Sequence, residues 1–171
     1  MDKKKKLLFD LLGLIGAGAL VTIDQVTKSL VMRDLTDGKE IVVLKGIFKI
    51  VSHKNTGAVW GILSGKTDVL SIVTVFIIAA VLFMYFRIPW QHKRLRALKW
   101  ICLFLTSGAI GNLIDRVQLK YVVDFLYFEL IDFPVFNVAD CYITMSMIVL
   151  IILIVFYYKD EDFEVIWPKK S

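Results

Sequence analysis

Two aspartates, Asp124 and Asp140, have the residue type and the surroundings needed for acid-base chemistry. Asp124 directly follows the β-branched pair Val122-Val123, and Asp140 lies near the start of a long apolar segment. If the intervening loop brings the two carboxyl groups together, both cannot ionise at once, so one retains a proton while the other is charged. The charged group can activate water, and the protonated group can donate to a carbonyl oxygen or a leaving amine. This pairing is typical of aspartic peptidase chemistry, whereas separately solvated aspartates are the alternative interpretation.

The pattern N-x-x-D occurs at two predicted helix ends, as Asn112 with Asp115 and as Asn137 with Asp140. Residues three apart lie on one face of a helix, so each Asn is expected to hydrogen-bond or orient a group near its own Asp. Asn137 also has a simpler interpretation, as the N-cap of the helix that follows it.

Three further charged residues accompany these groups. Asp24 and Lys28 are one helical turn apart with the acid first, which favours an intrahelical ion pair. Lys28 as the base of a Ser/Lys protease is the alternative, but the adjacent Ser29 would point elsewhere on the helix. Arg116 has three interpretations: an ion pair with Asp115, an anchor for a lipid phosphate, or a substrate contact.

The cysteines and histidines are not expected to form a catalytic or metal centre. Cys102 and Cys141 are predicted to differ in depth by most of a ~30 Å hydrocarbon core, far beyond the ~7 Å that a disulfide tolerates between Cα atoms. His53 and His92 are predicted to lie on opposite sides of the membrane, so they cannot share a zinc site. We therefore expect no metal and no cofactor.

The polar residues are exceptions in a strongly apolar chain. Of 171 residues, 57% are hydrophobic and only 22% are charged, and the mean hydropathy is +0.68. Because a soluble domain has about a quarter charged residues and about half apolar ones, a water-soluble globule is excluded. Three Pro, ten Gly without a period and two Cys also exclude disorder, collagen-like repeats and a disulfide scaffold. One integral membrane domain covering residues 1–171 remains.

Four apolar stretches are long enough to cross a bilayer, because a ~30 Å core needs about 20 helical residues. The predicted spans are residues 7–32, 69–86, 97–117 and 138–158. Clusters of Lys and Arg before the first span, between the second and third, and after the fourth all fall on one side, which is expected to be the cytoplasmic side. Both termini are therefore predicted to be cytoplasmic. These clusters account for the net charge of +5 without a nucleic-acid partner.

The first span has an alternative interpretation as a cleaved signal peptide, because Ala17-Gly18-Ala19 resembles a cleavage site. Asp10 interrupts the apolar run, however, and apolar residues continue beyond Ala19, which favours an uncleaved helix. Gly13 and Ala17 would then form a small-residue packing face.

The two outward stretches have different characters. Residues 40–52 are rich in β-branched residues and broken at Lys45-Gly46, which predicts a short hairpin, followed by a turn at Asn55-Thr56-Gly57. Residues 121–136 contain six aromatic residues, as is typical of the headgroup region. The Asp and Asn residues described above all fall on this outward side, whereas the inner helix ends are expected to carry only basic anchors.

Five short runs follow one another in a fixed order between Asp24 and Asp140. They are Asp24-Gln25-Val26-Thr27-Lys28, Asn55-Thr56-Gly57-Ala58-Val59-Trp60-Gly61, Gly111-Asn112-Leu113-Ile114-Asp115-Arg116, Val123-Asp124-Phe125 and Phe136-Asn137-Val138-Ala139-Asp140. Each is weakly specific alone, but in this order, in a four-pass chain of this size, they resemble the bacterial lipoprotein signal peptidase family, also called signal peptidase II. Val59 and Cys141 depart from the family pattern without removing a polar group.

The resemblance implies an all-α membrane protein with four transmembrane helices, a small outer-face β cradle and a short outer-face helix. It implies an aspartic endopeptidase that cleaves the signal peptide of diacylglyceryl-modified prolipoproteins immediately before the lipidated cysteine. The expected location is the bacterial cytoplasmic (inner) membrane, with the active site near the outer face. Expected partners are the prolipoprotein substrates, membrane lipids and globomycin-type inhibitors, and we expect a monomer.

By position in the motifs, the resemblance assigns roles to ten residues. Asp124 and Asp140 match the catalytic pair. The positions that line the substrate site are matched by Asn55, Gly57, Asn112, Arg116 and Asn137. Supporting positions are matched by Asp24, Lys28 and Asp115.

Two rival functions come from other classes. A small four-helix proton-coupled transporter would use a membrane acid, but its site would lie near the midplane and be reachable from both sides. A divalent metal site could use the four carboxylates as hard oxygen ligands; they belong to Asp24, Asp115, Asp124 and Asp140.

Overall fold

A computed structural model describes residues 3–35, 39–57 and 63–167. Among these residues, four helices are long and apolar enough to cross a membrane. They are α1 (Lys3–Asp34), α2 (Thr67–Arg87), α3 (Arg96–Leu119) and α4 (Val138–Phe156). The four spans predicted from hydropathy are therefore confirmed, with helix ends shifted by a few residues.

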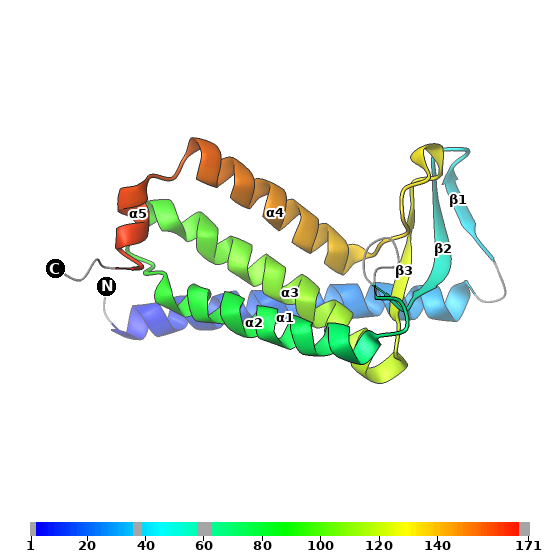
Figure 1. Cartoon of the computed structure of the whole chain (residues 1–171), viewed down its shortest axis with the longest axis horizontal. Helices are drawn as coiled ribbons and strands as arrows, with labels where there is room; N and C mark the ends of the chain where they lie inside the picture. The colour runs from blue at the N-terminus through cyan, green and yellow to red at the C-terminus, as the bar shows by residue number, and fades with distance from the viewer. Residues whose placement is uncertain (1–2, 36–38, 58–62, 168–171) are drawn as a thin grey trace.

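Helix α3 is the central helix, packed against α1, α2 and α4 (Figure 1). Small residues allow this close packing. A Cβ on Gly108 would lie 2.5 Å from the backbone oxygen of Ala139, and a Cβ on Gly111 would lie 2.5 Å from a carboxylate oxygen of Asp24. Both contacts are too short for any side chain larger than hydrogen, so these glycines bring α1 and α4 against α3.

The predicted packing face on α1 is also present. Gly13 and Ala17 are both buried, and a Cβ on Gly13 would lie 2.7 Å from the hydroxyl oxygen of Tyr85 in α2. The hydroxyl of Ser107 in α3 donates to the backbone oxygen of Ala17 at 3.2 Å. Helix α1 continues through residues 17–19 to Asp34.

A three-stranded antiparallel sheet lies at one end of the bundle, with its strands crossing the helix direction (Figure 1). Its strands are β1 (Ile41–Leu44), β2 (Phe48–Asn55) and β3 (Val122–Tyr127), in that spatial order. The predicted hairpin is confirmed, with Gly46 in its turn at φ +73°, a conformation that glycine adopts without strain. We call the end of the bundle that carries this sheet the sheet end. The opposite end, where α1 begins, is called the terminal end.

Three short elements complete the described chain: the 3-10 turns η2 (Lys93–Leu95) and η3 (Glu129–Ile131) and the helix α5 (Asp160–Glu164). Of these elements, η3 lies at the sheet end, where a short helix was expected from the family resemblance. Residues 58–62, which include part of the second motif, lie outside the described residues.

Helix α4 ends at Phe156 rather than at residue 158, which was the predicted boundary. The backbone N–H of Tyr158 donates to the oxygen of Leu153 at 2.8 Å, so the helical hydrogen-bond pattern is already lost there. A carboxylate oxygen of Asp162 then accepts from the backbone N–H of Lys159 at 3.0 Å, which stabilises the start of α5.

The prediction that the inner helix ends carry only basic anchors is wrong. Asp10 is buried at the terminal end, where its carboxylate accepts from Lys99 Nζ at 2.9 Å and from Trp90 Nε1 at 2.6 Å. The Lys99 ammonium also lies 3.9 Å from the ring centroid of Tyr85. An acid in an apolar run becomes tolerable because α2, the following loop and α3 surround it with donors.

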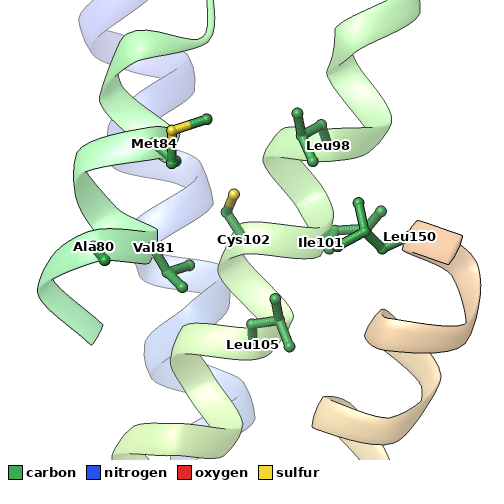
Figure 2. A pocket seen from close by; sticks show the side chains of 8 residues that line it. All are labelled: Ala80, Val81, Met84, Leu98, Ile101, Cys102, Leu105 and Leu150. Carbon is green, nitrogen blue, oxygen red and sulfur yellow. The ribbon is translucent and has the colours of Figure 1, made fainter. Parts of the chain in front are cut away.

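An apolar cavity of about 270 Å³ lies between α2, α3 and α4, in the half of α3 nearer the terminal end (Figure 2). Its lining includes Val81, Cys102 and Leu150, and all eight lining residues are apolar. With no polar side chain in its wall, this cavity is unsuited to acid-base chemistry, which must be sought at the sheet end.

Candidate active site

Asp124 and Asp140 are brought together at the sheet end by β3 and the first turn of α4. Asp124 is in β3, opposite His53 of β2. Asn137 caps α4: its Oδ1 accepts from the backbone N–H of Asp140 at 3.0 Å, and Asp140 Oδ2 accepts from the backbone N–H of Asn137 at 3.1 Å. The capping interpretation of Asn137 is confirmed, and the cap fixes the position of the Asp140 carboxyl group.

Asn137 also connects the two aspartates. Its Nδ2 donates to Asp124 Oδ1 at 2.7 Å, while the same residue holds Asp140 through the cap. The second oxygen of Asp124 accepts from Asn55 Nδ2 at 2.8 Å, and the second oxygen of Asp140 accepts from Asn112 Nδ2 at 2.8 Å. Each carboxyl oxygen therefore has a neutral donor with fixed geometry.

The Asn112 side chain has only one orientation that satisfies its neighbours. Its Oδ1 accepts from Lys28 Nζ at 3.0 Å and from Asn137 Nδ2 at 3.1 Å. Because two donors face the oxygen, Nδ2 must face Asp140. The expectation that Asn112 orients a group near its own Asp115 is confirmed, because the Lys28 ammonium that it holds lies 2.9 Å from Asp115, while its Nδ2 donates across to α4.

Lys28 neutralises two acids beside the aspartate pair. Its Nζ lies 2.9 Å from Asp24 Oδ2 and 2.9 Å from Asp115 Oδ2, and the lysine is buried. The predicted Asp24–Lys28 ion pair is confirmed. Lys28 Nζ is directed at these two carboxylates, and the hydroxyl of the adjacent Ser29 donates to the backbone oxygen of Gln25 at 2.8 Å, which argues against the Ser/Lys alternative.

Asp24 and Asp115 each also hold a backbone group of the neighbouring elements. Asp24 Oδ1 accepts from the N–H of Ala139 in α4 at 2.9 Å, and Asp115 Oδ2 accepts from the N–H of Val123 in β3 at 3.1 Å. Ala139 and Val123 directly precede Asp140 and Asp124. We call Asp24, Lys28 and Asp115 the Lys28 cluster. Through these two backbone hydrogen bonds it fixes the positions of both carboxyl groups relative to α1 and α3.

Gln25 belongs to this cluster, although the sequence reasoning assigned it no role. Its Nε2 donates to Asp115 Oδ1 at 2.9 Å and to the backbone oxygen of Gly111 at 3.1 Å. The sequence did contain a signal for this role: the Gln25 amide lies inside a predicted membrane helix, next to Asp24, and a polar side chain in such a helix needs a hydrogen-bonding partner.

The electrostatics of Asp124 suit proton exchange near neutral pH. Asp124 is 1% exposed, and burial, together with the charge of Asp140, raises the pKa of its carboxyl group to about 7. The hydrogen bonds from Asn55 and Asn137 act in the opposite direction and keep the rise smaller. At neutral pH the pair can therefore hold one proton between two carboxyl groups.

Arg116 points toward the loop after β2. Its Nη2 donates to the backbone oxygen of Gly57 at 3.3 Å, and the N–H of Gly57 donates to Asn55 Oδ1 at 2.9 Å, which confirms the predicted turn. The Arg116–Asp115 ion pair is not among the contacts of the described residues, because Asp115 faces Lys28. Arg116 Nε is buried without a partner in this part of the chain.

The remaining polar candidates do not gather at one point. Cys102 and Cys141 are both free, while His53 lies in β2 and His92 in the loop before η2. Within the described ranges, no three His, Cys, Asp or Glu residues are arranged to hold a metal ion. Asp24 and Asp115 are directed at Lys28, so the four-carboxylate metal site does not form there.

Comparisons with known proteins identify the family to which the chain belongs. The family model described as Signal peptidase (SPase) II matches residues 16–156. A lipoprotein signal peptidase of Geobacillus kaustophilus is 40% identical over 147 residues, which is 85% of this chain and 94% of the relative. One from Staphylococcus haemolyticus is 37% identical over 150 residues, covering 86% and 93%.

A solved bacterial membrane enzyme, determined by the in meso method at 1.9 Å resolution, has the same fold. It superposes with a TM-score of 0.74 at 34% identity, over 86% of this chain and 94% of the other. The family match covers all of the motif runs and both aspartates. The chain therefore belongs to the signal peptidase II family of membrane aspartic peptidases.

Proposed function

We propose that Asp124 and Asp140 are the catalytic pair with which this chain cleaves signal peptides from prolipoproteins. The observation that carries the proposal is the pair of hydrogen bonds from the buried Asn137, whose Nδ2 donates to Asp124 and whose backbone N–H donates to the Asp140 carboxyl group, while the pKa of Asp124 lies at about 7. Two carboxyl groups in that arrangement can exchange one proton at physiological pH. The names of the relatives, lipoprotein signal peptidases, support the substrate class.

The reaction uses one ionised and one protonated carboxyl group. The ionised group takes a proton from a water molecule as the oxygen attacks the scissile carbonyl carbon, and the protonated group donates to the carbonyl oxygen. The tetrahedral intermediate then collapses: the carboxyl group that now holds the proton gives it to the leaving amine, the C–N bond breaks, and the other carboxylate takes a proton from a hydroxyl of the intermediate. The pair again holds one proton, as at the start. The chain supplies both proton transfers without a metal or cofactor.

Asn55, Gly57 and Arg116 are proposed to contact the substrate backbone. Asn55 donates to Asp124, Gly57 donates to Asn55, and Arg116 donates to Gly57. The buried Nε of Arg116 is a donor without a partner among the described residues. Asn112 and Asn137, by contrast, use their amide donors on the carboxyl groups. We therefore assign these two to the orientation of the catalytic pair, in addition to lining the substrate site.

The proposed substrate is a diacylglyceryl-modified prolipoprotein, cut immediately before its lipidated cysteine. The site lies where the helices end, so a helical signal peptide and acyl chains could remain in the lipid while the scissile bond reaches water. We further propose that the protein acts as a monomer in the bacterial cytoplasmic membrane. The sheet end would face outward, both termini would be cytoplasmic, and globomycin-type inhibitors would compete for the site.

The decisive experiment compares cleavage by wild type, Asp124→Asn and Asp140→Asn. Purified protein in detergent is incubated with a diacylglyceryl-modified prolipoprotein, and the released signal peptide is measured. Losing either partner of an acid-base pair should lower the rate by about 10²–10⁴-fold. Asp132→Asn is the matched control, because Asp132 is exposed at the same end of the molecule and its carboxylate accepts a hydrogen bond from the Tyr127 hydroxyl, away from the two aspartates. Full activity in either catalytic variant contradicts the pairing.

The proposed orientation has a separate test. A single cysteine at Lys93, between α2 and α3, should react with a membrane-impermeant thiol reagent only after the cells are opened. Labelling in intact cells would reverse the orientation and leave the catalytic assignment untouched.

A further inference from the structure

The sheet ends in a cluster of exposed apolar side chains that catalysis does not use. The β1–β2 turn and η3 lie together at the end of the sheet above α4 in the view of Figure 1, and the N–H of Leu130 donates to the oxygen of Ile47 at 3.4 Å. We call Leu44, Ile47, Phe128, Leu130 and Ile131 the cradle tip. All five are exposed, and Leu130 and Ile131 are each 68% exposed.

Strand β1 extends this apolar surface. It consists of Ile41, Val42, Val43 and Leu44, and all four are exposed, so both of its faces lack cover. A strand with one face in water normally alternates polar and apolar residues. An uncharged, apolar edge strand in water would also promote aggregation. The sequence of β1 therefore indicates surroundings other than bulk water.

The sheet is connected too tightly to the helices to stand away from the bilayer. Strand β3 begins three residues after α3 ends. Phe136, which immediately precedes the N-cap of α4, exchanges backbone hydrogen bonds of 2.8 and 3.0 Å with Leu126 in β3. The sheet therefore lies at the level where two spanning helices end, which is the membrane interface.

A line of aromatic rings joins the tip to α4. The ring centroids are 5.0 Å apart between Phe48 and Phe128, 5.8 Å between Phe128 and Phe136, and 5.7 Å between Phe136 and Phe133. Aromatic side chains concentrate at the boundary between headgroups and hydrocarbon. The tip thus continues the lipid-facing surface of the spanning helices rather than forming an isolated patch.

Charges near the tip limit how deep it can lie. Lys49 pairs with Glu40 and Glu129, each at 3.0 Å, just behind the apolar residues. The outer edge of β1 pairs with no other strand in the described part of the sheet. Open strand edges are not tolerated in the hydrocarbon core, but headgroups and water can satisfy them. The depth that meets both conditions is the headgroup region.

We propose that the cradle tip is a second membrane contact, inserted into the phospholipid interface beside α4. Amphipathic elements at this depth bury apolar side chains while their polar groups stay among the headgroups. Because β2 and β3 carry Asn55 and Asp124, the contact would hold this part of the active site at a constant height above the bilayer. The contact itself does not depend on the proposed catalytic roles.

Photo-crosslinking identifies what covers the tip. The photoreactive residue p-benzoylphenylalanine replaces Leu130 in the full chain, which is reconstituted in vesicles of phosphatidylcholine and phosphatidylglycerol and irradiated. We expect a phospholipid adduct by mass spectrometry, comparable in yield with that from Ile148, an exposed residue of α4. No lipid adduct at Leu130 when Ile148 gives one would overturn the proposal. A cross-linked dimer in its place would instead assign the tip to a second copy.

A functional arm uses the double variant Leu130→Asn with Ile131→Asn. Since both side chains are exposed, thermal stability and cleavage in detergent should match wild type. In vesicles, kcat/KM for a membrane-bound substrate should fall several-fold, because the sheet loses its fixed height. Asp132→Asn, which removes no apolar surface from the same loop, should leave the vesicle activity unchanged. Equal vesicle activity in the double variant and wild type would contradict the positioning role, while the crosslinking result would still stand.

Discussion

The protein buries ion pairs at both ends of its helix bundle, and the two ends balance their charges differently. At the terminal end each buried acid has its own base: Asp10 accepts from Lys99, and Asp162 accepts from Arg94, both at 2.9 Å. At the sheet end Lys28 and Arg116 face four acids in the described residues, and Lys28 is shared by Asp24 and Asp115. The terminal cluster is electrically closed, whereas the sheet end retains an excess of carboxyl groups.

This difference separates a structural ion pair from a reactive one. A buried carboxylate with its own cation has no reason to bind a proton, so the Asp10–Lys99 pair serves to join α1 to α3. At the sheet end, Asp124 and Asp140 are held by neutral amides and have no cation within ion-pairing distance among the described contacts. Burial and mutual repulsion then keep a proton in the pair. The excess of acid over base is the property that makes this end chemically useful.

The largest expected effect comes from the same substitution at both ends. Lys99→Met leaves Asp10 buried without its cation, which should cost about 3–5 kcal/mol of folding free energy but leave cleavage per folded molecule unchanged. Lys28→Met should cost a similar amount and, by freeing the Asn112 amide, should also slow cleavage by about 10²-fold. Denaturant unfolding in detergent and the cleavage assay measure the two effects. Equal cleavage by the two variants would contradict the division of roles.

The Asp10–Lys99 pair offers a control for that comparison. Lys99→Met combined with Asp10→Asn removes both charges and should recover much of the lost stability. No recovery would mean that the lysine stabilises α3 through its contacts with Tyr85 and Trp90 rather than through Asp10.

Substitutions of Asn137 can separate its role as the N-cap of α4 from its proposed role in catalysis. Asn137→Ser retains a good N-cap for α4 but removes the Nδ2 donor to Asp124, so stability should change by less than ~1 kcal/mol. Cleavage should fall by about 10²-fold, because a preorganised donor is lost. Asn137→Ala loses both roles and should show the same loss of activity with an additional stability loss of about 0.5–2 kcal/mol. If Ser restored activity along with stability, the cap alone would explain the residue.

The pH dependence of both cleavage and stability should follow the ionisation of Asp124 at the sheet end. Because the pKa of Asp124 is raised to about 7, the shared proton is lost above that pH, and the cleavage rate should fall by about tenfold per pH unit there. For stability, a carboxyl group with a raised pKa favours the folded state most at low pH. That contribution is lost as the pH rises from about 4, the unfolded value, to about 7.

Thermal unfolding across that pH window tests the sign of the effect. Wild type should lose stability between pH 4 and 7 relative to Asp124→Asn, which has no titrating group at this position. In Asp140→Asn the loss should be smaller, because one of the causes of the raised pKa is removed. Parallel curves for wild type and Asp124→Asn would show that Asp124 ionises normally.

The smallest effects on cleavage are expected for substitutions of the glycines. Gly111→Ala places a methyl group 2.5 Å from the fixed Asp24 carboxylate, and Gly13→Ala places one 2.7 Å from the Tyr85 hydroxyl. Each should cost about 1–3 kcal/mol through overpacking, but only Gly111→Ala should also lower cleavage, by several-fold. Gly16→Ala is the control, since nothing lies within 4 Å of its Cβ. A fall in cleavage with Gly13→Ala would mean that the two ends are mechanically coupled.

Local features of the molecule were predictable because they depend on spacing along the chain. Hydropathy located the four spans, Lys45-Gly46 indicated the hairpin, and the spacing of Asp24 and Lys28 indicated their ion pair. The Asn137 cap follows from the same kind of rule. The proposal of Asp124 and Asp140 as the catalytic pair also came from sequence, through five ordered motifs that lie within the matched residues 16–156.

The contacts that were missed join residues far apart in sequence. The Asn112 amide also donates across to Asp140, and Arg116 reaches Gly57, because helix rotation decides where each side chain points. Asp10 finds its partner 89 residues away. The spacing of residues along the chain could not predict these contacts, because they depend on how α1, α3 and α4 are placed relative to one another.

By itself, the sequence determined the membrane as solvent, the helices that cross it and the residue types available for acid-base chemistry. These follow from apolar length, charge placement and short-range spacing. The tertiary structure alone decided which acids are neutralised and which share a proton. That decision depends on burial and on charges contributed by distant elements: Lys28 of α1 forms an ion pair with Asp115 of α3, while the side-chain hydrogen bonds of Asp124 in β3 and Asp140 in α4 come from amides among the described residues. A pKa is set by the three-dimensional surroundings of a group, and so the reactivity of the pair exists only once the chain has folded.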